Sequence, residues 1–375
     1  MVGVRTGGDL LTARHVLIAE GPGGPLAAAA RERYPSLRPL EPPSHAIAFR
    51  QTYRLPQASA GRFEPRAWHT FGAPLPTRTY GGGFLYRLAP DRIAAGLVVA
   101  LDAPMPPAPF SLFQQWLRHP FVAALLRDAE PESYGARLIP EGGWPAIPPF
   151  LQAANVTLLG DAASLLDPFA LKGIHLGIEA ALAAAERLAA AAADLSGNAA
   201  EVPLCPPDPL RRSDLPFAAR LRTYRNYRPA FARGLVPGVM GTGLAFLTRG
   251  CLPPGQGHLP GDLPSAHRPD TPSLPSHHAA IEAALARSGL APPPPGAPSH
   301  IQVLDPGKCH GCPHPCLHFC PSATYAPAPA PAEPLAAPPL LHPENCLHCH
   351  TCLLRCPRAN LRWAPPAPPA GPSYP

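Results

Sequence analysis

Hydrophobic and polar positions alternate at the start of the chain and predict that it begins inside a β-sheet. Val2 and Val4 alternate with polar neighbours, and the glycine-rich residues 7–9 are typical of a turn. A continuous apolar run follows at 16–19, as expected for a buried strand. The first 21 residues therefore predict a strand, a turn and a second strand.

Short apolar runs separated by turn residues continue from about 45 to 150 and predict a β-rich region. The clearest runs are 47–49 and 93–101. Trp116 and Phe121 lie in a stretch with helical spacing. This region is expected to be mainly short strands with one helix.

Residues 155–195 form the most distinct pattern, a strand followed by a long helix. The apolar run 156–159 ends at Gly160 and Asp161, a loop leads to Gly173, and an alanine-rich helix is predicted to about Asp194. Asp161 thereby follows a buried strand directly.

Proline-rich stretches then separate the rest of the chain into parts. The 59 prolines and 32 glycines make up about a quarter of the 375 residues, and 291–299 is typical of a linker. The longest uncharged apolar stretch, 234–247, is too short to span a bilayer and is expected to be broken by Pro237 and four glycines. It suits a membrane interface better than a crossing.

The net charge and the first 20 residues limit the expected partners and the cellular compartment. The net charge of +6 comes from scattered basic residues, so nucleic acid is not an expected partner. The first 20 residues contain charged side chains and no long apolar core, so we expect no signal peptide and a reducing, cytosolic compartment.

Eight cysteines in two runs near the end of the chain carry the strongest chemical signal. The second run matches C-x2-C-x2-C-x3-C-P, the ligand spacing of two-cluster ferredoxins, in which the fourth cysteine of each run ligates the other run's cluster. This rule predicts two ligand sets for 4Fe-4S clusters and hence one-electron transfer. The first set is Cys320, Cys346, Cys349 and Cys352; the second is Cys309, Cys312, Cys316 and Cys356.

The first run departs from this spacing, and other chemistries remain open. Three residues, 313–315, separate its second and third cysteines where two are usual, so its cluster rests on weaker grounds. Six histidines between His310 and His350 interleave with the cysteines, which leaves a zinc site possible. Disulfides would require an exported protein.

A second constellation, around Asp161, suits a flavin. Its carboxylate can accept a hydrogen bond from a ribityl hydroxyl, and a helix that begins near Gly173 offers free N–H groups to the flavin ring. The alternative is an ordinary turn after a strand. The candidate residues here are Gly160, Asp161, Lys172, Gly173, Ile174 and His175.

Several collinear stretches together resemble one family. They are 16–21, 79–86, 96–99, 134–137 with 141–143, 172–173, 225–229, and 319 through 363. In these stretches the chain resembles the electron transfer flavoprotein:ubiquinone oxidoreductase family and related bacterial systems that pair such a flavoprotein with a ferredoxin.

The resemblance implies an α+β multidomain fold. It consists of a partial FAD-binding α/β domain with an inserted β-rich quinone-binding domain, and a C-terminal ferredoxin-like iron–sulfur domain. The boundaries expected are 1–44 and 151–200 for the FAD domain, 45–150 for the quinone domain, 201–299 for a helical membrane-surface segment and linker, and 300–375 for the 4Fe-4S domain.

The resemblance also implies a function and its residues. Electrons would pass from reduced electron-transfer flavoprotein through a 4Fe-4S cluster and FAD to ubiquinone or menaquinone, at the cytoplasmic side of the inner membrane, with the protein bound peripherally. The family's single cluster falls on Cys320, Cys346, Cys349 and Cys352; Glu20 and Gly21 fall in the FAD domain; Gly81 and Gly82 fall in the quinone pocket; and 234–247 falls in the membrane-facing surface.

Two departures from the family qualify this picture. The family normally lacks the second cysteine set, and it begins with a strand, a Gly-x-Gly-x-x-Gly turn and a helix that grip the FAD pyrophosphate, which this sequence does not contain. We therefore expect an upstream FAD-binding segment to be missing or separately encoded. The alternatives are a ferredoxin-type carrier on a non-catalytic flavoprotein remnant and a flavin-dependent reductase of isoprenoid chains.

Overall fold

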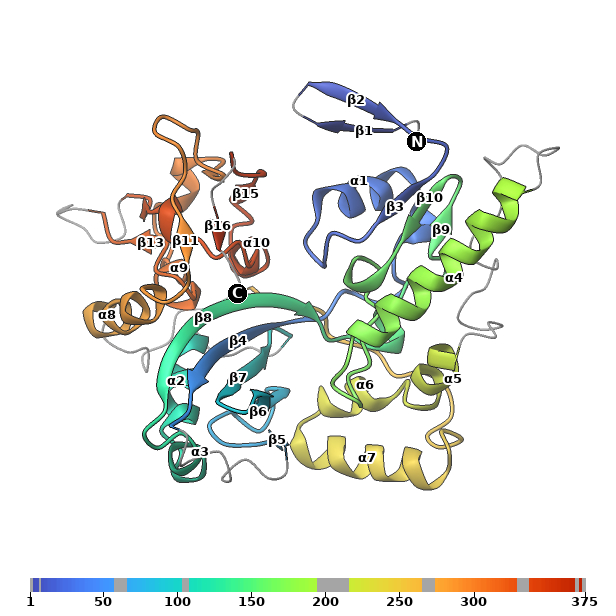
Figure 1. The fold of residues 1–375 in the computed structure, drawn as a ribbon, viewed down its shortest axis with the longest axis horizontal. Helices are drawn as coiled ribbons and strands as arrows, with labels where there is room; N and C mark the ends of the chain where they lie inside the picture. Colours follow the sequence, from blue (N-terminus) through green and yellow to red (C-terminus); the bar gives the residue numbers. More distant parts are fainter. Residues whose placement is uncertain are drawn as a thin grey trace. The chain divides into compact units, whose positions relative to one another are not determined.

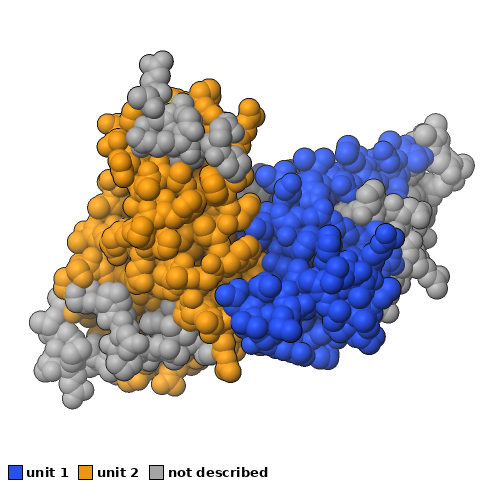
Figure 2. All heavy atoms as spheres, turned by 90° about the horizontal axis from the view of Figure 1, so that it is seen from below, with its two compact units in different colours: residues 1–45, 139–261 blue, residues 46–138, 262–375 orange. Residues whose placement is uncertain are grey.

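The computed structural model describes residues 3–6, 8–56, 66–102, 108–193, 216–264, 274–328, 337–367 and 371–372. The chain is a mixed α/β protein with several small sheets (Figure 1). It divides into two compact units, each built from two separate segments (Figure 2). Unit 1 comprises Met1–His45 and Ile139–Gly261, and unit 2 comprises Ala46–Leu138 and Asp262–Pro375.

Unit 1 contains the predicted strand-and-helix pattern around Asp161. Strand β3 (Val16–Ile18) pairs in parallel with β10 (Val156–Leu158), which pairs antiparallel with β9 (Gln152–Ala153). Helices α1 (Pro25–Arg33) and α4 (Ile174–Ala193) bury alanines against this sheet. Within 16–18, Leu17 is exposed, because only alternate side chains of a strand face the same core. The hairpin β1 (Gly3–Thr6) and β2 (Asp9–Thr12) precedes it.

The rest of unit 1 is helical. Helices α5 (Pro216–Thr223) and α6 (Tyr227–Phe231) lead to α7 (Leu235–Leu247), which runs through the whole apolar stretch. Pro237 does not break α7, contrary to the sequence expectation, because a proline in the first helical turn removes no intrahelical hydrogen bond.

Small residues attach α7 to α6 and leave its apolar side chains outside. A Cβ on Gly238 would lie 2.3 Å from the Phe231 ring, and one on Gly241 would lie 3.0 Å from Ala230 Cβ. The glycine face therefore packs against α6 while the large side chains face solvent. Those exposed are Val236, Val239, Met240, Leu244, Phe246 and Leu247.

Unit 2 is organised around a five-stranded sheet in the order β5, β6, β7, β4, β8. The strands are β4 (His45–Arg54), β5 (Ala67–Thr70), β6 (Gly81–Ala89), β7 (Arg92–Ala100) and β8 (Glu130–Pro140). Strands β4, β6, β7 and β8 are longer than the short strands that the sequence predicted for this region. Helix α2 (Pro109–Leu117) supplies Phe110, Phe113 and Trp116 to the core of this sheet, and α3 (Pro120–Leu125) supplies Val122.

The glycine run 81–83 in β6 is required by close packing, which gives a stability prediction. A Cβ on Gly83 would lie 2.1 Å from the Trp116 indole, whose Nε1 donates to Thr70 Oγ1 at 2.9 Å. We expect Gly83→Ala to lower the free energy of unfolding by about 1–3 kcal/mol, because the indole must shift. Urea unfolding followed by tryptophan fluorescence measures this.

The matched control is Gly243→Ala on α7, where no atom lies within 4 Å of the added Cβ. There alanine is expected to be neutral or to stabilise by up to about 1 kcal/mol. Equal stability of the two variants would contradict the packing role of Gly83.

The cysteine-rich part of unit 2 is built from two similar halves. The first runs from β12 (Ile301–Val303) through a 3₁₀ turn (Pro306–Cys309) and α9 (Cys316–Phe319) to β13 (Tyr325–Ala326). The second runs from β14 (Leu340–Leu341) through a 3₁₀ turn (Pro343–Asn345) and α10 (Thr351–Arg355) to β15 (Leu361–Trp363). β12 pairs with β15 and β13 pairs with β14, both antiparallel, so each half supplies one strand to each pair.

Two further elements complete unit 2. Helix α8 (Leu274–Leu285) contacts α9 through two histidines: His277 Nε2 lies 3.0 Å from the carbonyl oxygen of His318, and His278 Nε2 lies 2.9 Å from that of Leu317. Strand β11 (Leu290–Ala291) pairs with β16 (Gly371–Pro372). The helix that carries Cys316 is therefore held from outside the cysteine segment.

Candidate metal centre

The first predicted ligand set is assembled from two loops and two short helices. Cys320 directly follows α9 and Cys352 lies in α10, while Cys346 and Cys349 lie on the loop between the 3₁₀ turn Pro343–Asn345 and α10. His348 and His350 both adopt left-handed backbone conformations, with φ of 52° and 60°. Such angles are uncommon for non-glycine residues, and here they turn the chain on either side of Cys349.

Burial disfavours the charged form of three of these thiols, those of Cys346, Cys349 and Cys352. It raises the pKa of Cys349 to about 11 and that of Cys352 to about 12, with a further contribution from Cys320 in both cases. It raises the pKa of Cys346 well above its usual value, and nearby Cys349, Cys352 and Cys320 add to this. The four thiols therefore influence one another as a group. Coordination to iron would offset the cost of deprotonating them, so this donor set fits a 4Fe-4S cluster.

Polar groups and an apolar wall surround the same sulfurs. The backbone N–H of His348 donates to Cys346 Sγ at 3.4 Å, and Cys320 Sγ lies 3.4 Å from Ser322 Oγ. Phe319 and Tyr325 belong to the apolar cluster that contains Cys320 and Cys346. N–H and O–H groups aimed at sulfur, together with exclusion of water, are what tune such a centre.

Two residues of β8 hold this set from outside, and sequence reasoning assigned them no role. The Tyr134 hydroxyl donates to the carbonyl of Pro321 at 2.8 Å, next to Cys320. Arg137 Nη1 donates to the carbonyl of His348 at 3.1 Å, next to Cys349. Both lie in the stretch 134–137 that contributed to the family resemblance. That resemblance was the feature of the sequence that could have pointed to them.

A competing arrangement shares one of these cysteines. Ligand atoms of His300, Cys346 and His348 all lie within 4.8 Å of one another. His300 is buried, and its Nε2 has no hydrogen-bond partner. Three such donors could hold a zinc ion. Because Cys346 cannot serve both centres at once, metal analysis separates the two.

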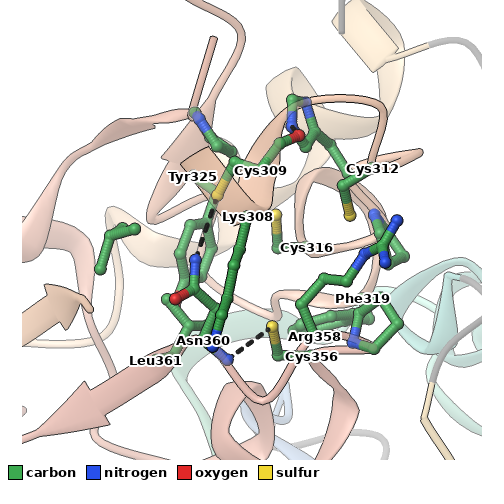
Figure 3. A pocket seen from close by; sticks show the side chains of 15 residues that line it. Lys308, Cys309, Cys312, Cys316, Phe319, Tyr325, Cys356, Arg358, Asn360 and Leu361 are labelled. Carbon is green, nitrogen blue, oxygen red and sulfur yellow. Dashed lines mark hydrogen bonds between the residues drawn. The ribbon is translucent and has the colours of Figure 1, made fainter. Parts of the chain in front are cut away.

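The second predicted set is also brought together. Cys309, Cys312, Cys316 and Cys356 line one pocket of the cysteine-rich segment, and their sulfurs are drawn in Figure 3. Burial raises the pKa of Cys316 well above its usual value, and nearby Cys320, Cys312, Cys356 and Cys309 add to this. The two sets therefore adjoin through Cys316 and Cys320.

Several of the predicted flavin residues meet in unit 1. Gly160 and Asp161 follow β10, and Glu20 follows the parallel neighbour β3, so all three lie at the same edge of the sheet. A Cβ on Gly173 would lie 3.5 Å from Asp161 Oδ1, and α4 begins one residue later. Burial raises the pKa of Asp161, while His45 opposes this shift. A carboxylate beside a helix N-terminus is suited to a polar ring edge.

The other predicted flavin residues have local structural roles or are exposed. Glu20 Oε1 accepts the backbone N–H of Ala27 in the first turn of α1. Lys172 is exposed, and its backbone forms a two-way bridge with Asp167. Asp167, which the sequence analysis did not single out, pairs with Arg220 at 2.6 Å and so fixes the loop before Gly173. Gly21 has φ of 89°, and His175 is half-buried.

Gly81 and Gly82, the predicted quinone residues, lie at the start of β6. A Cβ on Gly81 would lie 2.1 Å from the carbonyl oxygen of Val98, and one on Gly82 would lie 2.2 Å from that of Thr70. Sheet packing alone therefore requires glycine at both positions. Their contact with a quinone stays a prediction.

Among the residues described, no helix has both the length and the apolar character needed to cross a membrane.

Paired four-cysteine groups in a duplicated segment of short strands and helices are typical of iron–sulfur proteins that transfer electrons. Comparison with known families agrees and is more specific. The ubiquinone-binding domain of ETF-QO matches residues 45–139, and the 4Fe-4S domain of electron transfer flavoprotein-ubiquinone oxidoreductase matches residues 298–375. Two segments of the chain thus match domains of electron transfer flavoprotein-ubiquinone oxidoreductase, and the resemblance inferred from its sequence is confirmed.

Relatives of known function extend this likeness over most of the chain. The mitochondrial electron transfer flavoprotein-ubiquinone oxidoreductase of Oryza sativa is 29% identical over 97% of this chain and 64% of its own. The human protein of that name is 27% identical over 97% of this chain and 61% of its own. This chain thus spans less than two thirds of the length of these relatives.

Among solved structures, a geranylgeranyl bacteriochlorophyll reductase-like protein from Thermoplasma acidophilum is 14% identical, covering 66% of this chain and 55% of its own. Its TM-score of 0.41 is too low to support an argument about this chain.

Proposed function

We propose that this chain is an electron-transfer oxidoreductase that carries electrons from reduced electron-transfer flavoprotein to a membrane quinone. The observation that carries this proposal is the convergence of Cys320 with Cys346, Cys349 and Cys352 inside the matched 4Fe-4S domain. When bound there, a 4Fe-4S cluster supplies one-electron transfer. The four thiols would hold it, and the surrounding apolar side chains would keep water away from it.

FAD is the second cofactor in this proposal, and unit 1 offers part of a site for it. Asp161 would accept a ribityl hydroxyl's hydrogen bond, while the N-terminus of α4, beside Gly173, would face the ring. Gly160 and His175 belong to the same proposed site. The finer fold assignment, a partial FAD-binding domain and a ferredoxin-like domain, forms part of the proposal.

The quinone would meet residues of the matched ubiquinone-binding domain, with the backbone at Gly81 and Gly82 as the proposed contact. The exposed apolar face of α7 would bring the protein to the lipid surface where such a quinone resides. Ubiquinone and menaquinone share the carbonyl groups that a backbone N–H recognises. Peripheral attachment to the inner membrane is part of this proposal.

An anaerobic assay of the whole chain, reconstituted with iron, sulfide and FAD, tests the proposal. Reduced electron-transfer flavoprotein is the donor, and a soluble ubiquinone analogue is the acceptor. Turnover is the expected result. A preparation with full iron and flavin content but no turnover would contradict the proposal.

The same preparation also tests the alternative of a ferredoxin-type carrier. Brown cluster absorbance with no flavin retained after incubation with FAD would favour that alternative. It is kept because the sequence contains no Gly-x-Gly-x-x-Gly turn for the pyrophosphate of FAD.

A further inference from the structure

We propose that Cys309, Cys312, Cys316 and Cys356 hold a second 4Fe-4S cluster and that Asn360 positions this cluster and tunes its reduction potential. This site lies beyond the proposed function, which uses only the other four cysteines. It also does not depend on quinone turnover, because its presence is read from bound metal.

The geometry of the pocket favours a cluster over a single zinc ion. All four cysteines line one pocket, walled by Phe319, Tyr325 and Leu361 among others (Figure 3). Tetrahedral zinc with Zn–S bonds of about 2.3 Å needs its sulfurs within about 4 Å of one another. Among the described residues, no three cysteine sulfurs form a group within 4.8 Å. A cubane places each thiolate on a different iron, so its sulfurs stand further apart.

The extra residue in the first cysteine run is absorbed without displacing a ligand. His314 takes a left-handed conformation with φ of 45°, following Gly311 with φ of 65°. The buried His314 ring lies with Nε2 3.0 Å from the carbonyl of Cys309, which also accepts the N–H of Cys312 at 3.1 Å. The loop closes on itself, and Cys316 still begins its helix.

The repeat within the fold supports the same conclusion. Cys316 begins α9 and Cys352 lies in the first turn of α10, while Cys320 and Cys356 each follow the last residue of those helices. In both cases the N–H of the final cysteine donates to the carbonyl of the third. The two halves therefore present their cysteines in equivalent positions, although only one half has the regular spacing.

Asn360 contacts two of the four sulfurs. Its Oδ1 accepts the N–H of Asp305 at 3.0 Å, which fixes the orientation of the amide. Its Nδ2 then donates to the carbonyl of Asp305 at 2.7 Å and reaches Cys309 Sγ at 3.5 Å. Its backbone N–H donates to Cys356 Sγ at 3.4 Å. Both contacts with sulfur are dashed in Figure 3.

These contacts define Asn360 as a positioning residue with an electronic effect. An N–H group directed at a ligand sulfur stabilises the extra negative charge of a reduced cluster and raises its reduction potential. Asn360 is 1% exposed, so water does not replace these contacts easily. In the sequence, only its position four residues after Cys356 indicated that Asn360 could lie near the cysteine ligands.

The first test counts metal in the whole chain after anaerobic reconstitution. About eight iron atoms and eight inorganic sulfides per chain are expected, falling to about four of each in Cys356→Ser. Cys251→Ser, which removes an exposed free cysteine, should stay near eight. About four irons in the unaltered chain, unchanged by Cys356→Ser, would overturn the second cluster. So would one zinc per chain that Cys356→Ser removes.

The second test addresses Asn360 through its potential. Asn360→Leu keeps the side-chain volume but removes the amide donor to Cys309. Redox titration followed by electron paramagnetic resonance should show one of two signals shifted to lower potential, with iron still near eight per chain. Loss of about four irons would support the positioning role alone. If both reduction potentials are unchanged and iron is still near eight per chain, the proposed role of Asn360 is overturned. The existence of the second cluster is then decided by the iron count of the first test alone.

Discussion

Replacing Cys349 by serine is expected to remove about four iron atoms per chain and to lower electron transfer from reduced electron-transfer flavoprotein to a quinone by at least about 100-fold. Serine has nearly the same size but a harder oxygen donor, which iron–sulfur clusters disfavour. Iron quantitation and the electron paramagnetic resonance spectrum of the reduced chain measure the first effect. Reduction of a soluble ubiquinone analogue by reduced electron-transfer flavoprotein, with the whole reconstituted chain, measures the second.

Of the four proposed ligands, Cys349 is the one whose replacement affects the first set without involving another candidate site. Cys320 adjoins the second set through Cys316, and Cys346 also belongs to the group with His300 and His348. The charges and hydrogen bonds that shift the pKa of Cys349 come from Cys320, Thr351 and Arg137, and none of these belongs to the second set. Its replacement therefore reports on the first set alone.

Two control variants separate this cluster from a zinc site. Cys251→Ser is expected to leave iron unchanged, because Cys251 is an exposed free cysteine outside the cysteine-rich segment. His300→Ala is also expected to leave iron unchanged, whereas a zinc ion held by His300, Cys346 and His348 would be lost. Zinc that disappears in His300→Ala, with iron unaffected by Cys349→Ser, would contradict the proposed ligand set.

The second large effect is expected at the apolar face of α7. Met240 and Leu247 are 71% and 81% exposed, which is costly for side chains of this kind unless a lipid surface receives them. Burying each side chain is worth about 1.5–3 kcal/mol. We expect the double change Met240→Glu with Leu247→Glu to weaken vesicle binding by at least about 100-fold, measured by flotation with phosphatidylcholine and anionic lipid.

A matched control uses another exposed apolar pair of unit 1. Leu10 and Leu11 on β2 are 50% and 61% exposed, and their replacement by glutamate adds the same charge away from α7. Binding should then stay close to that of the unaltered chain. Equal loss in both variants would indicate a general charge effect, and no loss in the α7 variant would exclude α7 as the membrane face.

The local elements could be predicted because short-range patterns carry them. The strand and helix around Asp161 follow from an apolar run, a Gly-Asp turn and an alanine-rich stretch, and they occur as β10 and α4. The prediction that Pro237 interrupts its segment was wrong. The proline and glycine content of the segment indicated a break. Pro237 lies in the first turn of α7, where a missing backbone N–H costs no intrahelical hydrogen bond, so the helix continues through it.

The amino-acid sequence by itself determined which cysteines could act together, because the spacing of thiols along a short loop limits what each can reach. Only the tertiary structure decided what surrounds them. Tyr134 and Arg137 reach the cysteine loops from β8, and Asn360 reaches Cys309 across 51 positions. The structure also decided that the glycine face of α7 packs inward and its large side chains face out. Contacts between distant segments depend on how whole elements pack, and no local pattern specifies that packing.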